Sequence, residues 1–272
     1  MSTTTVTAEA GAAVEPARSR PVPRPIPMSR VMGVELRKMF DTRSGFWLMA
    51  SVAILAVLAT GATILFAPDA DLDYETFASA IGFPMAVILP MIAVLSVTSE
   101  WSQRSGLTTF TLVPHRERVI AAKLIVSVAI GVVSMVVAGA IGAVGNVVGT
   151  AITGTETVWN VSVTEFAYII LANVLGMLIG FMLGVVIRNS PGAIVAYFVY
   201  SFVLTTLSML LASTQQWFAD IQGWVDFNFA QGALFEGEMS GEAWGQLAVS
   251  GSFWLVIPLT VGLALVMRSE VK

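Results

Sequence analysis

The stretch TSEWSQRSGLTTFTLVPHRERVIAAK, residues 98–123, is a polar interruption between two long apolar runs. It contains four basic residues, Arg104, Arg116, Arg118 and Lys123. It also contains two acids, Glu100 and Glu117. Outside this stretch, the N-terminal segment and one later acidic loop, the chain consists of long apolar segments. The fold therefore depends on where these apolar segments are placed and on which side of them the charged stretch lies.

The composition is that of a polytopic membrane protein. Hydrophobic residues make up 56% of the 272 residues and charged residues only 12%, whereas a soluble domain has about 25% charged residues. The absence of cysteine excludes disulfides, thiolate nucleophiles and cysteine metal sites. The single histidine, His115, cannot build a histidine metal site, and we interpret it as an ordinary polar loop residue.

Six apolar segments are long enough to cross about 30 Å of hydrocarbon, which takes about 20 helical residues. The predicted spans are residues 46–66, 77–97, 124–148, 166–187, 193–212 and 247–267. Pro84 and Pro90 interrupt the second span. The sequence therefore predicts an all-α fold with six transmembrane helices.

The charges divide cleanly between the two sides of this layout. With the N-terminus in the cytosol, all 14 Lys and Arg residues fall in the cytosolic segments. The predicted outer segments, residues 67–76, 149–165 and 213–246, hold 11 acids and no basic residue. Because cytosolic loops are enriched in basic residues, this division predicts a multi-pass protein of the cytoplasmic membrane with both termini in the cytosol.

The chain before the first span has two parts. Residues 1–28, which include the run RSRPVPRPIP, have the composition of a disordered cytosolic tail, and residues 29–272 form the membrane domain. The tail is either a binding segment for a partner or a solvated basic flank. Ser29 can cap a helix that runs to about residue 43. An apolar stripe formed by Met32, Leu36, Met39 and Phe40 predicts that this helix lies in the membrane interface.

Several kinds of chemistry have no residues to support them. No predicted span has an ionisable residue near its middle, which argues against a proton-coupled transporter. The sequence also lacks a P-loop motif for nucleotide binding. We therefore expect neither an enzyme nor a cofactor or metal site in this chain.

Small and polar residues in the spans suggest packing faces and a pathway. Gly176, Gly180 and Gly184 repeat every four residues in the fourth span and favour close helix packing, although flexibility is an alternative. The possible pathway-lining residues are Asn146, Asn173, Tyr197, Tyr200 and Thr205. Interhelical hydrogen bonding is the simpler role for the two asparagines. Ordinary interhelical packing is an equal alternative for the residues of the fifth span. The aromatic-rich outer stretch 213–246 is either an interfacial anchor or a pair of re-entrant half-helices.

Three stretches are similar to one known family. VELRKMFDTRSGFWL, residues 34–48, looks like the basic connecting helix that enters the first span of ABC-2 type exporter permeases. SEWSQRSGLTTFTLVPHRERVIAAK, residues 99–123, looks like the first cytosolic loop of that family, and RSEVK, residues 268–272, resembles its ending. The resemblance implies that two six-span subunits pair above two separate P-loop ATPase subunits, which bind the ATP and Mg.

The resemblance also implies that the connecting helix and first cytosolic loop couple ATPase closure to the spans. The candidate coupling residues are Glu35, Arg37, Lys38, Glu100, Trp101, Arg104, Arg116 and Arg118. The alternative is that these charges only set the orientation of the protein in the membrane. We expect an exporter of an amphiphilic substrate such as a drug, lipid or peptide-like molecule, with the lipid bilayer, the ATPase and a second permease as partners and no nucleic acid. The alternatives are a non-transporting scaffold or sensor subunit, and an energy-independent channel.

Overall fold

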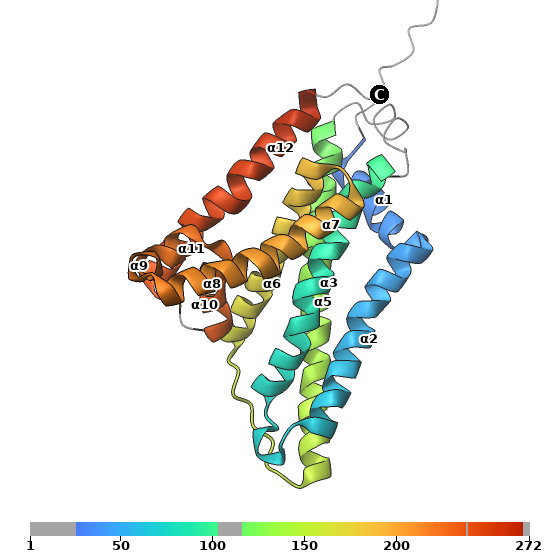
Figure 1. The fold of residues 1–272 in the computed structure, drawn as a ribbon. Helices are drawn as coiled ribbons and strands as arrows, with labels where there is room; N and C mark the ends of the chain where they lie inside the picture. The colour runs from blue at the N-terminus through green and yellow to red at the C-terminus, as the bar shows by residue number, and fades with distance from the viewer. Residues whose placement is uncertain (1–25, 103–115, 238, 269–272) are drawn as a thin grey trace, which may run out of the picture.

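The structure is a computed structural model that describes residues 26–102, 116–237 and 239–268 (Figure 1). Helices dominate these residues, and no strand occurs among them. Six of the helical segments are long and apolar enough to cross a membrane. The predicted all-α fold with six spans is therefore confirmed.

The helices follow one another in the order of the predicted spans. Their bounds are α1 Met28–Asp41, α2 Arg43–Phe66, the short 3-10 helix η1 Asp69–Asp71, α3 Tyr74–Ser102, α5 Arg116–Thr153, α6 Val163–Ile187, α7 Ser190–Phe198, the π-helix η2 Val199–Leu204, α8 Thr205–Thr214, α9 Gln216–Val225, α10 Phe227–Glu236, α11 Gly241–Gly251, the π-helix η3 Ser252–Val256 and α12 Ile257–Arg268. The fifth span is α7–η2–α8 and the sixth is α11–η3–α12.

Four helices, α2, α3, α5 and α6, pack side by side as a bundle (Figure 1). The centre of this bundle lies along α3 and α6, because about half of the span formed by each is buried, against 11% of the fifth span. The main apolar core includes Met85 and Leu89 of α3 with Met177 and Phe181 of α6. A second core joins α6 to η2, α10 and α11. Both halves of the molecule are therefore built on α6.

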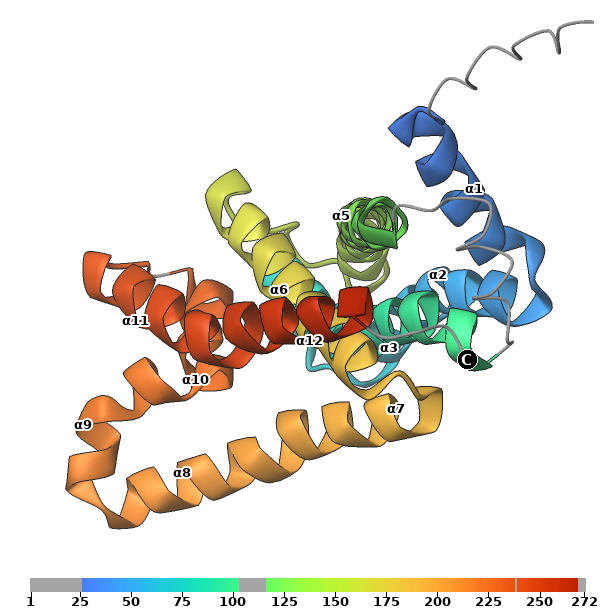
Figure 2. The same cartoon turned by 90° about the horizontal axis from the view of Figure 1, so that it is seen from above.

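The fifth and sixth spans diverge from the bundle, as the view from above shows (Figure 2). The short helices α9 and α10 connect the ends of these spans and pack against α11. Each span also contains a π-helical segment, and Tyr200 of η2 contacts Trp254 of η3, with ring centroids 5.5 Å apart. π-Helical turns are rare and frequently occur at functional sites. The region around this contact is therefore a candidate functional region.

The predicted outer stretch 213–246 is helical rather than a loop. It contains α9, α10 and the first turns of α11. Phe227 and Leu234 are buried in the second core, whereas Trp217 and Phe229 are mostly exposed. The stretch therefore has both a packed face, as half-helices would have, and exposed aromatic rings suited to a membrane interface.

Helix α1 is joined to α2 by a tight elbow at Thr42. The Thr42 hydroxyl accepts a hydrogen bond from the Gly45 amide at the start of α2. A side chain at position 45 would collide with the backbone carbonyl oxygen of Met39, so the elbow requires glycine there. The two helices are therefore connected without a flexible linker.

Two local predictions about α1 need correction. Its N-cap is Pro27 rather than Ser29, and no side chain caps the helix. The predicted apolar stripe is also divided between two faces. Met32 and Met39 pack against the bundle, whereas Leu36 and Phe40 are exposed. The stripe divides because Glu35 occupies the buried face of α1, where it meets Lys38 of the same helix and Lys123 of α5. The predicted tail before Ile26 lies outside the described residues.

The prolines of α3 and the glycines of α6 account for the closest helix contact. Helix α3 continues through Pro84 and Pro90. A β-carbon at Gly180 would lie 2.6 Å from the carbonyl oxygen of Pro90, and one at Gly184 would lie 3.3 Å from that of Val94. Both glycines therefore allow the backbones of α3 and α6 to approach closely.

We predict that Gly180→Ala lowers the free energy of unfolding by about 1–3 kcal/mol, because the added methyl group cannot fit against Pro90. Gly61→Ala is the matched control, since a β-carbon at position 61 of α2 meets nothing within 4 Å. Denaturant titration of both variants in detergent measures the difference. Equal stability of the two variants would contradict the assigned packing.

Candidate functional site

Four charged side chains from three helices form an ion cluster at one end of the bundle. Lys123 of α5 donates to Glu35 of α1, and its Nζ lies 3.2 Å from Oε1 of Glu100 on α3. Lys38 of α1 lies 2.9 Å from both Glu35 and Glu100. Lys123 also donates to the backbone carbonyl of Ser96, at 3.0 Å. The ion cluster, defined as Glu35, Lys38, Glu100 and Lys123, therefore ties α1 to two spans.

Burial makes the ion cluster energetically sensitive. Lys123, Glu35 and Glu100 are each about 95% buried, whereas the Lys38 side chain is 42% exposed. Removing such charges from water is strongly unfavourable unless opposite charges and hydrogen bonds compensate for it. Burial by itself lowers the pKa of Lys38, but the carboxylates of Glu35 and Glu100 outweigh this effect and raise the pKa above its ordinary value. Lys38 therefore stays protonated and balances the two acids together with Lys123.

The chain brings these groups together by simple local geometry. Glu35 and Lys38 are three residues apart on α1 and so lie on the same face of the helix. Glu100 lies in the last turn of α3, and Lys123 lies two turns into α5. Because α3 and α5 are antiparallel neighbours at this end of the bundle, their two charges meet α1 together (Figure 1).

The remaining predicted coupling residues are distributed around this cluster. Trp101 is half-buried against the main core, and Arg37 is exposed on α1. The Arg118 guanidinium donates to the backbone carbonyl of Ile26 at 2.7 Å. Arg116 is the first residue of α5, and its side chain lies outside the described part. Arg104 also lies outside the described residues. The structure thus joins Glu35, Lys38 and Glu100 but does not bring the other predicted residues into the ion cluster.

Lys123 is the member of the cluster that the sequence did not single out for coupling. In the sequence it is one of the charges of the polar stretch 98–123. Its position at the edge of a long apolar run was the available signal, since a lysine there needs an acidic partner when its helix is packed.

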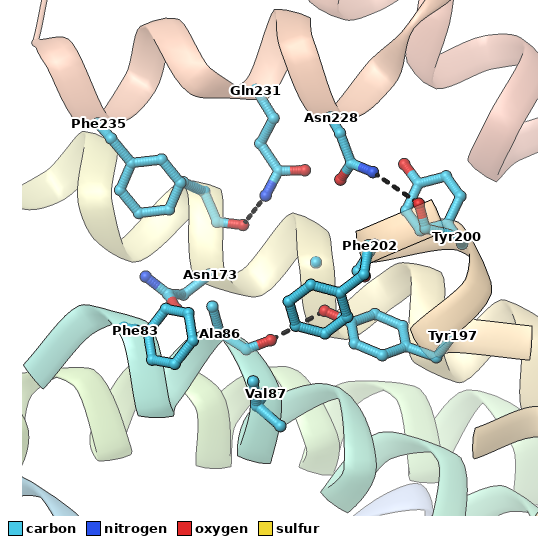
Figure 3. Close-up of a pocket in the computed structure, with 13 residues that line it drawn as sticks. Phe83, Ala86, Val87, Asn173, Tyr197, Tyr200, Phe202, Asn228, Gln231 and Phe235 are labelled. Atoms are coloured by element: carbon cyan, nitrogen blue, oxygen red, sulfur yellow. Dashed lines mark hydrogen bonds between the residues drawn. The ribbon is translucent and has the colours of Figure 1, made fainter. Parts of the chain in front are cut away.

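A second feature is a cavity of about 190 Å³ between α3, α6, η2 and α10 (Figure 3). Three predicted pathway residues, Asn173, Tyr197 and Tyr200, line it. The fourth, Thr205, lies beside it and accepts a hydrogen bond from Asn228 at 2.9 Å. The structure therefore gathers four of the five predicted pathway residues.

Tyr197 shows how the cavity wall is held. Its hydroxyl donates to the carbonyl oxygen of Ala86 at 2.8 Å (Figure 3). Pro90 lies four residues after Ala86 and has no N–H to donate within the helix. The tyrosine thus replaces the missing helical hydrogen bond. The proline of the second span and the tyrosine of the fifth span are therefore linked through the Ala86 carbonyl.

Asn146 does not belong to this cavity. Its carboxamide nitrogen donates to the carbonyl oxygen of Val158, which fastens the loop after α5 to that helix. Gly176, by contrast, lines the cavity instead of packing directly against a helix backbone.

Two cavity residues, Asn228 and Gln231, were not identified from the sequence. Both come from α10, inside the aromatic-rich outer stretch. Their carboxamides were the available signal, but the sequence does not show that α10 folds back against α6.

The six spans and the absence of strands among the described residues define a multi-pass all-α membrane protein. No group of acids or histidines suited to a metal ion occurs in the described part of the chain. The family model described as ABC-2 family transporter protein matches residues 34–204, which is more than half of the chain. The protein therefore belongs to the ABC-2 transporter family and is a permease subunit of an ABC transporter rather than its ATPase. A comparison with curated proteins gives no match.

We predict that Lys123→Met lowers the free energy of unfolding by about 3–5 kcal/mol, because it leaves two buried carboxylates facing Lys38 alone within the ion cluster. Lys38→Met should lower it by about 1 kcal/mol, since Lys38 is partly solvated. Denaturant titration in detergent measures both values.

The double variant Glu35→Gln with Lys123→Met tests the pairing directly. Its loss of stability should be smaller than the sum of the two single losses, because each single change leaves the other charge without its partner. Additive losses would contradict a direct interaction between Glu35 and Lys123.

Proposed function

We propose that the protein is the membrane subunit of an exporter that moves an amphiphilic substrate across the cytoplasmic membrane and is driven by a separate ATPase. The observation that carries this proposal is the buried ion cluster. It fixes a surface helix, α1, to the ends of two spans, α3 and α5. A force applied to α1 is therefore transmitted to both spans through charged contacts that are costly to break.

Helix α1 also presents a surface on which the ATPase can act. Its exposed residues include Val34, Leu36, Arg37 and Phe40. A mixture of apolar residues and arginine is typical of protein interfaces. The ATPase, with its bound ATP and Mg, docks against this face and the adjoining end of α3. ATPase closure then moves α1 as a lever whose elbow is Thr42.

The distribution of charge supports a cytosolic location for this end of the molecule. The basic end of α5, the end of α12 with Arg268 and the end of α6, which Arg188 follows, lie at the same end of the molecule as α1 (Figure 1). Basic residues concentrate on the cytosolic side of membrane proteins. Both termini therefore face the cytosol, where the ATPase is available.

Exposed apolar surface supports the remaining partners. The fifth span is the least buried and exposes Val203, Leu207 and Leu210. Lipid covers most of such surface, and a second permease subunit, identical or different, covers the rest. The cavity beside η2, with its aromatic rings and amide groups, supports an amphiphilic substrate.

We predict that Arg37→Glu reduces the stimulation of ATP hydrolysis by the permease at least about fivefold, the effect expected when one charged contact at an interface is reversed. The measurement is the ATPase rate of the assembled complex in nanodiscs. Arg268→Glu is the matched control, because Arg268 is also exposed but lies on α12.

The same complex, placed in liposomes for the transport assay, separates the alternatives. Stimulation that survives Arg37→Glu unchanged would contradict coupling through α1. A channel would pass solute in liposomes without ATP, and a scaffold would bind the ATPase without any transport.

A further inference from the structure

A second cavity adjoins the first at the acidic end of the molecule. It has a volume of about 320 Å³, within the range of small-molecule sites. Three carboxylates from three helices line it: Glu75 of α3, Glu165 of α6 and Glu236 of α10. Asn160 also lines it and donates to Glu75 at 3.1 Å and to Asp73 at 2.8 Å. We call this space the outer cavity and the first one the inner cavity.

The two cavities share part of their walls. Phe83, Ala86 and Phe235 line both of them. Phe83 and Phe235 are 70% and 46% exposed, so neither ring is locked into a packed core. A ligand that leaves the inner cavity between these two rings would therefore enter the outer cavity directly.

The inner cavity is bordered by hydrogen-bond acceptors that lack partners. The carboxamide nitrogens of Asn173 and Gln231 donate to the backbone carbonyls of Ile169 and Ala172, at 2.9 and 2.6 Å. Because a carbonyl can only accept, these bonds fix which atom of each amide is nitrogen and which is oxygen. Oδ1 of Asn173 and Oε1 of Gln231 are then buried without a hydrogen-bond partner among the described residues.

Such unpartnered acceptors are unusual in a native protein, because burying an acceptor without a hydrogen bond destabilises the fold. The hydroxyl of Tyr200, which also lines the inner cavity, is likewise buried without a hydrogen-bond partner in the described part of the chain. A ligand that brings N–H donors would supply the missing partners. Figure 3 shows the Asn173 carboxamide on the side of the inner cavity where Phe83 and Phe235 lie.

We propose that the two cavities form one binding route, within a single subunit, for a small organic cation that has an aromatic or apolar body and N–H donors. The aromatic rings accept the apolar body and attract positive charge through their faces. The amide oxygens accept the N–H groups, and the outer carboxylates attract the cation toward the acidic side.

Charge selectivity follows from the groups around the outer cavity. The facing ionisable groups are the carboxylates of Glu75, Glu165 and Glu236, with Asp73 joined through Asn160. Residues 67–76, 149–165 and 213–246 contain no lysine or arginine to offset them. An anion of the same size would therefore be repelled. This inference rests on the proposed export function, since it names the class of substrate.

Binding of ethidium to the full chain in nanodiscs, without ATPase or ATP, tests the route by fluorescence anisotropy. Ethidium is an aromatic cation with amine donors. We expect saturable binding that weakens about tenfold in the double variant Glu75→Gln with Glu236→Gln, since each exposed charge contributes up to about fivefold. Glu156→Gln, which removes an exposed acid on the same side but away from both cavities, should bind ethidium unchanged.

Asn173→Leu tests the acceptor. It should weaken ethidium binding about fivefold, the effect of one hydrogen bond. It should leave competition by tetraphenylphosphonium, a cation without N–H groups, unchanged. The fold should tolerate this change, because leucine has a similar volume and removes an unpartnered acceptor. Its thermal unfolding midpoint serves as the check.

Three results would overturn the proposal: no saturable ethidium binding, equal binding of the anion fluorescein, or equal affinity in the double variant and Glu156→Gln. Failure here is distinguishable from failure of the proposed function. A complex whose ATPase responds to Arg37→Glu but that binds no ethidium keeps the export mechanism and loses the cationic substrate. Ethidium binding by a chain that stimulates no ATPase would keep the cation site and lose the export mechanism.

Discussion

The contact between Lys123 and Glu35 is the interaction on which the end of the bundle next to α1 depends. It buries opposite charges from α5 and α1, and Glu100 brings α3 to the same point. Charges at this depth are tolerated only as a matched group, so the three helices cannot separate without exposing an uncompensated charge. The ion cluster thus keeps α1 in a fixed relation to the bundle, which a lever must have if work is to pass through it.

The rest of the molecule depends on α6. Its glycine face lies against α3 without intervening side chains, and its other side carries the second core with η2, α10 and α11. The bundle and the diverging spans therefore meet along one helix. The inner cavity lies at this junction. Gly176 has no side chain to fill the space, and the Ala86 carbonyl, which Pro90 cannot bond, accepts from Tyr197. Movement of α3 would reach the cavity wall through this same hydrogen bond.

Sequence reasoning predicted the spans well because lipid imposes a length and a composition that can be read locally. It was less accurate at helix ends. Helix α5 begins at Arg116, eight residues before the predicted third span, because its first turns extend beyond the apolar run. Among the candidate pathway residues, Asn173, Tyr197 and Tyr200 line the inner cavity, and each is a polar group in an apolar span. Asn146 satisfied the same criterion but binds a loop carbonyl instead, a distinction that composition does not contain.

The sequence by itself determined the membrane class, the number of spans and the division of charge between the two sides. Each of these follows from the free energy of transferring side chains and backbone into lipid, which depends on residue type alone. Only the tertiary structure decided that Glu35 and Lys123, 88 residues apart, form a buried pair. It also decided that α10 folds back to close the inner cavity and that Phe83 and Phe235 separate it from the outer one. These contacts depend on how helices pack, and packing is set by the shapes of several distant segments at once.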